Sequence, residues 1–197
     1  EEAAELLRAA DELAKRPAGL VRQLCDFSKA GDIAPREFPL SGVDSKLRDE
    51  FMSSRIPIDI DLPAIVFTGD DGKILLMLRL LVQRSVESLE GREGWINVGG
   101  NMTMKEVSGQ QGNFLFLMVA NNGPAIPEGA LKNVFEPFFN PYDGRPETGD
   151  LKLATVAAIA SAHGGWAECV SSNVGVMFYV YLPMAKQEPT TPENHIG

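Results

Sequence analysis

A short apolar run ends in the residues that could bind a ligand. Phe114 to Ala120 is typical of a buried strand, and it stops at Asn121-Asn122-Gly123-Pro124, which predicts a turn. The Asn121 side chain could offer its carbonyl oxygen to a ligand. A helix-like segment follows and ends in Phe135-Glu136-Pro137-Phe138-Phe139. Residues 121–127 therefore predict either a binding pocket or a plain structural turn that caps the strand.

Four segments together resemble the histidine-kinase ATPase domain, a family shared with DNA gyrase, a heat-shock chaperone and MutL. Residues 117–140 are similar to its first glycine box and F box, roughly D-x-G-x-G-I and then F-E-P-F. LLVQRSVESL at 80–89 is similar to the N box, N-L-x-x-N-A-x-E-S-L. Residues 148–165 resemble the second glycine box, which ends in H-G-G, and residues 175–183 its last strand. The order and spacing match over nearly the whole chain.

The resemblance implies an ATP site whose functional letters have changed. The family's adenine-binding Asp falls on Asn121, and the two N-box asparagines fall on Leu80 and Arg84. The second glycine of the first box falls on Ala125, and the three glycines of the second box fall on Thr148, Asp150 and Lys152. The vestigial ATP-pocket positions implied by the resemblance are Asn121, Gly123, Ala125, Arg84 and Lys152. We predict no catalytic residue, no metal ligand and no bound cofactor, with ATP and Mg²⁺ as the alternative.

The replacement of the N-box Asn by Arg84 is expected to harm metal binding more than the Asn121 replacement harms adenine binding. The family's Asn ligates Mg²⁺, and a guanidinium has no acceptor. Arg84 could contact phosphate directly, pair with an acidic neighbour and plug the cavity, or lie on the solvent face. Asn121 could still accept a hydrogen bond. Ala125 would be penalised if its φ were positive.

The second glycine box lacks the glycines that would let its backbone N–H groups hold phosphates. Asp150 would repel them, whereas Lys152 could offer a compensating charge. The alternative is that residues 144–152 form an ordinary helix start with Thr148 or Asp150 as N-cap.

Residues 1–30 have helical periodicity that is broken near Pro17 and Gly19, so they form a kinked helix or two helices. GLVRQLCDFSKAG resembles the end of the second helix of a dimerisation and histidine-phosphotransfer domain. We expect an apolar stripe to form a dimer seam, the alternative being packing on the chain's own core; its residues are Leu6, Leu13, Leu20, Leu24 and Phe27. Gly31 to Pro39 is expected to be a polar linker.

The remaining periodicity predicts an α/β two-layer sandwich, with one mixed sheet covered by helices and preceded by the N-terminal helical segment. Helices are expected at 43–52, 73–90 and 151–163, the last ended by Gly164-Gly165. Strands are expected at 56–61, 95–106, 113–120, 166–171 and 176–182, and Gly69 to Gly72 is expected to be a turn. The predicted domains are a helical segment at 1–34, the degenerate ATPase-like domain at 35–185 and a disordered tail at 186–197.

The short segment Asn140 to Gly149 is expected to be either mobile or held by packing of the Phe135 to Phe139 cluster alone, since no phosphates would hold it. Burying one phenylalanine contributes about 1.5–3 kcal/mol, so a Phe138→Ala change is expected to lower stability or partner affinity.

Composition excludes several classes of function. The 197 residues carry a net charge of −9 with a pI near 4.8, which argues against nucleic acid as a partner. Cys25 and Cys169 lie far apart, and neither an 18-residue apolar run nor a signal peptide is visible, so we expect no membrane contact and a cytoplasmic, reducing location. His163 is expected to be structural, and His195 lies in the tail. The start, Glu-Glu-Ala-Ala, suggests a piece of a longer protein whose phospho-acceptor helix lies outside it.

Two functions follow from the resemblance. The first is a two-component signalling module that acts as a regulatory, interaction or phosphotransfer scaffold, forms a homodimer, and meets a response-regulator receiver domain or a partner kinase. The alternative is a divergent but active ATP-dependent protein histidine kinase. The lost positions disfavour phosphoryl transfer, which depends on positioning and electrostatics.

Overall fold

The computed structural model describes residues 19–107, 110–140 and 150–184. Residues 19–28 are helical, and the elements that follow are β1 (Arg36–Pro39), α2 (Ser41–Phe51), β2 (Ile58–Asp61), β3 (Val66–Gly69), α3 (Asp71–Ser88), β4 (Ile96–Val107), β5 (Gln110–Asn121), α4 (Glu128–Leu131), α5 (Lys152–Ala162), β6 (Trp166–Ser172) and β7 (Gly175–Pro183).

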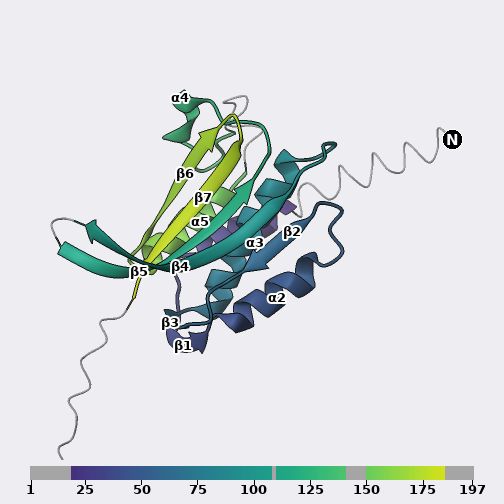
Figure 1. The fold of residues 1–197 in the computed structure, drawn as a ribbon. Coiled ribbons are helices and arrows are strands. Elements are labelled where there is room, and N and C mark those ends of the chain that lie inside the picture. The colour runs from purple at the N-terminus through teal and green to yellow at the C-terminus, as the bar shows by residue number, and fades with distance from the viewer. Residues whose placement is uncertain (1–18, 108–109, 141–149, 185–197) are drawn as a thin grey trace, which may run out of the picture.

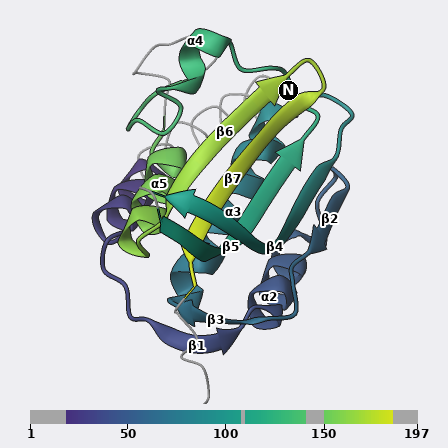
Figure 2. The same ribbon diagram turned by 60° about the vertical axis from the view of Figure 1, so that its left-hand side comes forward.

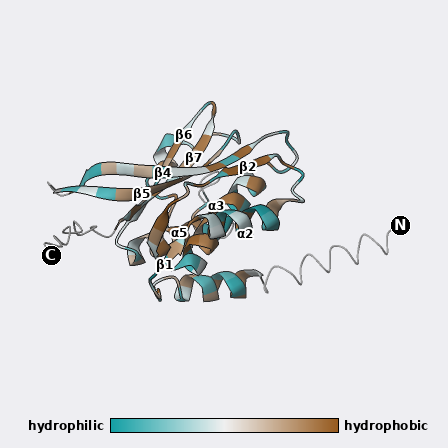
Figure 3. Cartoon of the chain, turned by 60° about the horizontal axis from the view of Figure 1, so that its bottom comes forward, coloured by the Kyte–Doolittle hydropathy of each residue, from teal (hydrophilic) through white to brown (hydrophobic). Residues whose placement is uncertain are grey.

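Five strands form one mixed sheet in the order β2-β4-β5-β7-β6. β2 runs parallel to β4, and the other neighbours are antiparallel. Helices α2, α3 and α5 form a second layer on one face of this sheet (Figures 1 and 3). The predicted two-layer α/β sandwich with a mixed sheet is therefore confirmed, and the five strands expected from the sequence are the five strands of the sheet.

The expected linker at Gly31 to Pro39 is wrong in its second half. Arg36–Pro39 forms β1, which pairs with β3 as a separate two-stranded sheet at one end of the sandwich (Figure 2). Phe38 and Phe67 are buried there and meet edge to face, with ring centroids 6.1 Å apart. This pairing joins segments about thirty residues apart, so local sequence patterns could not reveal it.

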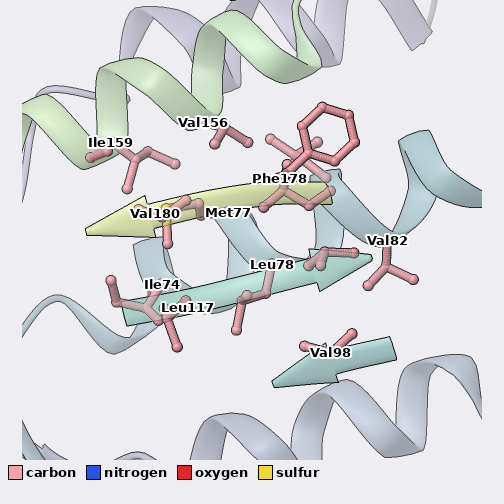
Figure 4. Close-up of a cluster of buried hydrophobic side chains, with 14 of the residues drawn as sticks. Ile74, Met77, Leu78, Val82, Val98, Leu117, Val156, Ile159, Phe178 and Val180 are labelled. Carbon is pink, nitrogen blue, oxygen red and sulfur yellow. The ribbon is translucent and has the colours of Figure 1, made fainter. Parts of the chain in front are cut away.

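The core lies between the sheet and α3 and α5, and it follows from the alternation of side chains along the strands. Val98, Leu117 and Val180 point from three neighbouring strands toward the helices (Figure 4). Ile74 on α3 and Ile159 on α5 meet them and are fully buried. This packing holds α3 and α5, which carry most of the candidate site, against the sheet strand β5, which carries the remaining residues.

His163 joins the end of α5 to the start of α3. Its Nε2 accepts a hydrogen bond from the Asp70 N–H (3.1 Å), and its Nδ1 lies 2.8 Å from the Ile159 carbonyl oxygen. Asp70 is the N-cap of α3, because its carboxylate accepts from the N–H of Lys73. Burial is the largest influence on the pKa of Asp70 and would raise it, but bonds from the N–H groups of Ala34 and Lys73 outweigh it and lower the pKa. The expected turn at Gly69 to Gly72 thus contains the end of β3 and the start of α3, and the structural role expected of His163 agrees with these bonds.

Candidate functional site

Three elements bring the predicted site residues together. Asn121 is the last residue of β5, Arg84 lies on α3, and Asp150 and Lys152 lie at the start of α5. α3 packs against both β5 and α5 and thereby places the four residues on the helix-covered side of the sheet.

The Asn121 side chain is buried and bonded within the protein. Only 2% of the residue is exposed, and its Nδ2 donates to Ser85 Oγ on α3 (3.0 Å). Its Oδ1 accepts from the Gly123 N–H (2.9 Å) and from the Ser88 hydroxyl (3.5 Å). The carbonyl oxygen that could have served a ligand therefore already has one firm donor, the Gly123 N–H, because the single hydroxyl hydrogen of Ser88 is directed to the Ser85 carbonyl oxygen (2.8 Å).

The space beside Asn121 is small. A cavity of about 10 Å³ lies there, lined by Arg84, Ser88, Asn121, Ile126, Val176 and Phe178. A single water needs at least about 10–15 Å³, whereas ligand pockets measure about 300–1,000 Å³. In this conformation the cavity accommodates one water at most, and no heterocyclic base.

The loop after β5 is held by its own contacts. A Cβ at Gly123 would lie 2.8 Å from both Asn121 Oδ1 and Ser88 Oγ, so the glycine permits the close approach of loop and helix. Ile126 donates its N–H to Ser171 Oγ on β6 (2.8 Å). Ala125 is exposed, and among the described residues Phe138 is the one non-glycine with positive φ. The penalty considered for Ala125 therefore does not arise.

The Lys152 side chain reaches from the start of α5 to α3. Its Nζ lies 2.9 Å from Glu87 Oε1 and 2.6 Å from Asp150 Oδ2, and its side chain is 12% exposed. Burial is the largest influence on its pKa and would lower it, but the hydrogen bonds and charges of Asp150 and Glu87 together raise the pKa. The compensating charge predicted for Lys152 is thus used to neutralise Asp150 within the protein.

Arg84 also faces this ion pair. Its Nη1 lies 4.0 Å from Glu87 Oε2, and its side chain is 16% exposed. The solvent-face alternative is therefore wrong, because the side chain lies over the small cavity beside Asn121. The geometry agrees with the alternative in which Arg84 pairs with an acidic neighbour.

Asp150 behaves as a cap for α5. Its Oδ1 accepts the Lys152 N–H (2.8 Å), although the helix itself begins at Lys152 and Leu151 stands in the formal N-cap position. The Leu151 N–H donates to Gln23 Oε1 of the helix at 19–28 (3.0 Å), which lies beside α5 in Figure 2. The Asp150 alternative for the helix start is supported, while Thr148 lies outside the described residues.

The phenylalanine segment differs from its expected role. Phe135 packs against the core, but Phe138 is 36% exposed and has a φ of 60°. Its N–H donates to the Asp150 carbonyl oxygen (3.0 Å), so the backbone contact, with little help from the side chain, holds this segment to the start of α5. The expectation that Phe138 anchors the loop by burial is wrong, and residues 141–149 of that loop lie outside the described residues.

Sequence reasoning missed the partners of the site residues. Ser85 and Glu87 were present in LLVQRSVESL, and Ser85 stands where the family motif has Ala. Helical spacing of three places Ser85 beside Ser88 and Arg84 beside Glu87. That spacing was the available signal that Ser85 and Ser88 would face Asn121 and that Glu87 would face Lys152. Within the described ranges, no three His, Cys, Asp or Glu side chains gather in a way that could hold a metal ion.

Comparison with known proteins identifies the family. Residues 69–186 match the family described as histidine kinase-, DNA gyrase B-, and HSP90-like ATPase. This match covers α3, the sheet from β4 onward and α5, which are the elements that build the site. The chain therefore belongs to this ATPase family, and the resemblance drawn from its four motifs is confirmed.

Curated relatives are sensor histidine kinases. The chain is 30% identical over 192 residues to the C4-dicarboxylate transport sensor protein DctB of Rhizobium meliloti, which covers 93% of this chain and 29% of that protein. It is 27% identical over 189 residues to the sensor kinase CckA of Brucella abortus, covering 89% of this chain and 20% of that protein. The chain thus spans less than a third of the length of these relatives and is of the histidine kinase-like, two-component sensor family.

Solved structures share the fold. The Acinetobacter baumannii histidine kinase AdeS superposes with a TM-score of 0.68 at 20% identity, covering 91% of this chain and 84% of that one. The histidine kinase ThkA in complex with the response regulator protein TrrA gives a TM-score of 0.67 at 24% identity, covering 89% and 49%. Among the described residues, no helix has the length and apolar character needed to cross a membrane.

Proposed function

We propose that this chain is a regulatory module of a two-component sensor protein that keeps the histidine-kinase ATPase fold without using Mg²⁺ and ATP. The observation that carries the proposal is that the polar side chains at the family's functional positions are bonded to other groups of the same chain. Asn121 is bonded to Ser85 and Gly123, and Lys152 is held by Glu87 and Asp150. A scaffold that docks partners or relays phosphate from them needs the fold and none of that pocket.

The electrostatics support the same proposal. Mg²⁺ would have to approach Arg84 and Lys152, two cations that repel a divalent ion, while their carboxylate partner Glu87 is already shared between them. Phosphates would meet the Asp150 carboxylate at the start of α5, where the family motif has a glycine. Phosphoryl transfer depends on the positioning of metal and phosphates, and each of these changes opposes it.

We further propose that the segment at residues 1–34 is a helical dimerisation element preceding the ATPase-like domain at 35–185. In the described part of that segment, Leu20, Val21 and Leu24 are 43%, 59% and 46% exposed. A helix that leaves three adjacent apolar side chains in water gains free energy by packing against a second copy. Loss of dimers in sedimentation after removal of residues 1–30 would support the seam, whereas an unchanged mass would refute it.

The partner proposed for this module is a response-regulator receiver domain or a partner kinase. ThkA, a relative by fold, has been solved in complex with a response regulator protein, and the curated relatives are sensor kinases. These similarities support a location in two-component signalling inside the cell. They leave the divergent, active kinase as the competing function.

Calorimetry distinguishes the two functions. ATP is titrated into the chain with and without Mg²⁺, and in parallel into a variant that restores family letters, Arg84→Asn with Asn121→Asp and Lys152→Gly. We expect no measurable heat of binding for the unmodified chain in either condition. Micromolar binding that requires Mg²⁺ would overturn the proposal. Binding gained only by the restored variant would show that these three side chains are the block.

A further inference from the structure

The face of the sheet opposite the helices is unusually apolar. In a sheet covered on one side, outward positions are normally polar. Here the register places a group of large apolar side chains outward on β5, β6 and β7, which we call the aromatic face; it comprises Phe116, Met118, Trp166, Met177, Tyr179 and Tyr181. Helices α2, α3 and α5 all lie on the other side (Figures 1 and 3). Tyr181 is buried (8% exposed) and the other five are half-buried, so together they form a contiguous apolar surface of the kind found at interaction sites.

The rings of the aromatic face hold one another in place. Trp166 stacks on Tyr181 with centroids 4.9 Å apart, and Phe116 lies 5.6 Å from Tyr181 and 5.4 Å from Tyr179. The Tyr179 hydroxyl lies 3.1 Å from Met177 Sδ, a weak acceptor that a partner's carbonyl could replace. Side chains that are already ordered lose little conformational entropy when a partner binds. Aromatic residues and methionine are also the types enriched in protein interfaces.

The edge of this sheet face formed by β2 carries negative charge. Lys105 lies over the Tyr181 ring (3.6 Å to the centroid) and 3.8 Å from Glu168, so its charge is met within the chain. Asp59 and Asp61 on β2 are exposed, and their pairing with Asn97 and Gly99 of β4 places them on the same outward face. The edge beside the aromatic face is therefore negative, although the Arg48 guanidinium on α2 interacts electrostatically with both aspartates.

Strand β4, with small outward side chains, separates these carboxylates from the rings. Between Asn97 and Lys105, the outward residues of β4 are Gly99, Asn101 and Thr103, and a Cβ built on Gly99 would meet nothing nearer than 3.7 Å. Strands lie about 4.8 Å apart, so β2 and β5 are separated by about 10 Å, close to the diameter of an α-helix. A helix lying over β4 would touch the aromatic face on one side and the two aspartates on the other.

We propose that this outer face docks an amphipathic helix of another protein, with apolar side chains against Phe116, Met118 and Tyr179 and with lysine or arginine toward Asp59 and Asp61. The net charge of −9 disfavours a second copy of this chain as the occupant, because two copies repel each other. The site lies on the opposite face from the ATP-like pocket and is independent of the function proposed for that pocket.

A designed peptide probes the chemistry directly. It is a helix of about 18 residues with a leucine and phenylalanine stripe flanked on one edge by lysine, and its matched control carries glutamate on that edge. Fluorescence anisotropy measures binding to the full chain. We expect saturable binding of the lysine peptide alone, and about tenfold weaker binding to the double variant Asp59→Lys with Asp61→Lys. Asp49→Lys, an exposed reversal on α2, is the matched control and should leave affinity unchanged.

Carbon-13 methyl spectra of the methionines locate the bound peptide. The Met118 and Met177 signals should shift on addition of the lysine peptide, whereas Met52, which is 80% exposed on the helix layer, should not. Absence of saturable binding, an equal effect of Asp49→Lys, or a shift of Met52 alone would overturn the proposal. If removal of residues 185–197 shifted the Met118 and Met177 signals, the occupant would be the chain's own tail and the proposal would be wrong. If raising the protein concentration shifted these signals, the occupant would be a second copy and the proposal would also be wrong.

Discussion

Replacing Asn121 by leucine tests whether this residue serves the fold. The change keeps side-chain volume roughly constant and removes the amide. It deletes the bonds to Ser85 Oγ (3.0 Å), the Gly123 N–H (2.9 Å) and the Ser88 hydroxyl (3.5 Å). Ser88 retains its bond to the Ser85 carbonyl oxygen (2.8 Å), so the main losses fall on Gly123 and Ser85.

The size of the effect follows from burial. Asn121 is 2% exposed, so water cannot replace the lost partners of the Gly123 N–H. Leaving one buried donor unpaired costs about 1–3 kcal/mol, and leucine recovers little because it faces the polar Ser85 and Ser88. We expect Asn121→Leu to lower the free energy of unfolding by about 2–3 kcal/mol. Asn122→Leu breaks an exposed bond to the Trp95 N–H (2.8 Å) that water can replace, so it should cost less than about 1 kcal/mol.

Urea unfolding followed by circular dichroism measures both variants, with the slope of the transition checked for two-state behaviour. A larger loss for Asn121→Leu than for its neighbour supports a structural role of the amide. Equal losses within error would refute the reasoning, because they would mean that the buried network around Asn121 contributes no more than an exposed bond.

Three further outcomes are expected. The native pKa of Lys152 is raised above its ordinary 10.5, so its contribution to stability is fully present below about pH 10.5 and is lost as pH rises through the native value. Glu87→Gln should reduce that alkaline loss in urea midpoints, by less than about 1 kcal/mol because Glu87 is 45% exposed; an unchanged pH profile would contradict the pairing. Burial raises the pKa of Cys169 to about 12, so N-ethylmaleimide should label exposed Cys25 alone in the folded chain and both in urea, as read by mass spectrometry; native labelling of Cys169 would contradict this. Phe138→Gly should be more stable in thermal melts than Phe138→Ala by about 1 kcal/mol, since glycine accepts a φ of 60° without strain; the reverse order would show that this backbone is unstrained.

Periodicity and turn residues were enough to predict most of the fold. The apolar runs in 113–120 and 176–182 and the helical spacing in 73–90 are local patterns, and each predicted an element within a few residues of its observed bounds. β1 and β3 were not predicted because REFP and VFTG lack the alternation of apolar and charged residues seen in IDID of β2, a strand of the same length. Their pairing depends on the contact between Phe38 and Phe67, far apart in the chain.

For the candidate site, the sequence by itself determined which residue types stand where the family has its functional letters. It thereby determined that Arg84 cannot ligate a metal and that Asp150 brings a negative charge. Only the tertiary structure decided that Asn121 bonds to Ser85, 36 positions away, that Lys152 pairs with Glu87, and that Ala125 has no strained backbone. It also decided that the outward side chains of three strands form one apolar face. Residue type fixes what a group can donate, accept or carry as charge, whereas its partner depends on which distant elements the packing of the core brings within reach.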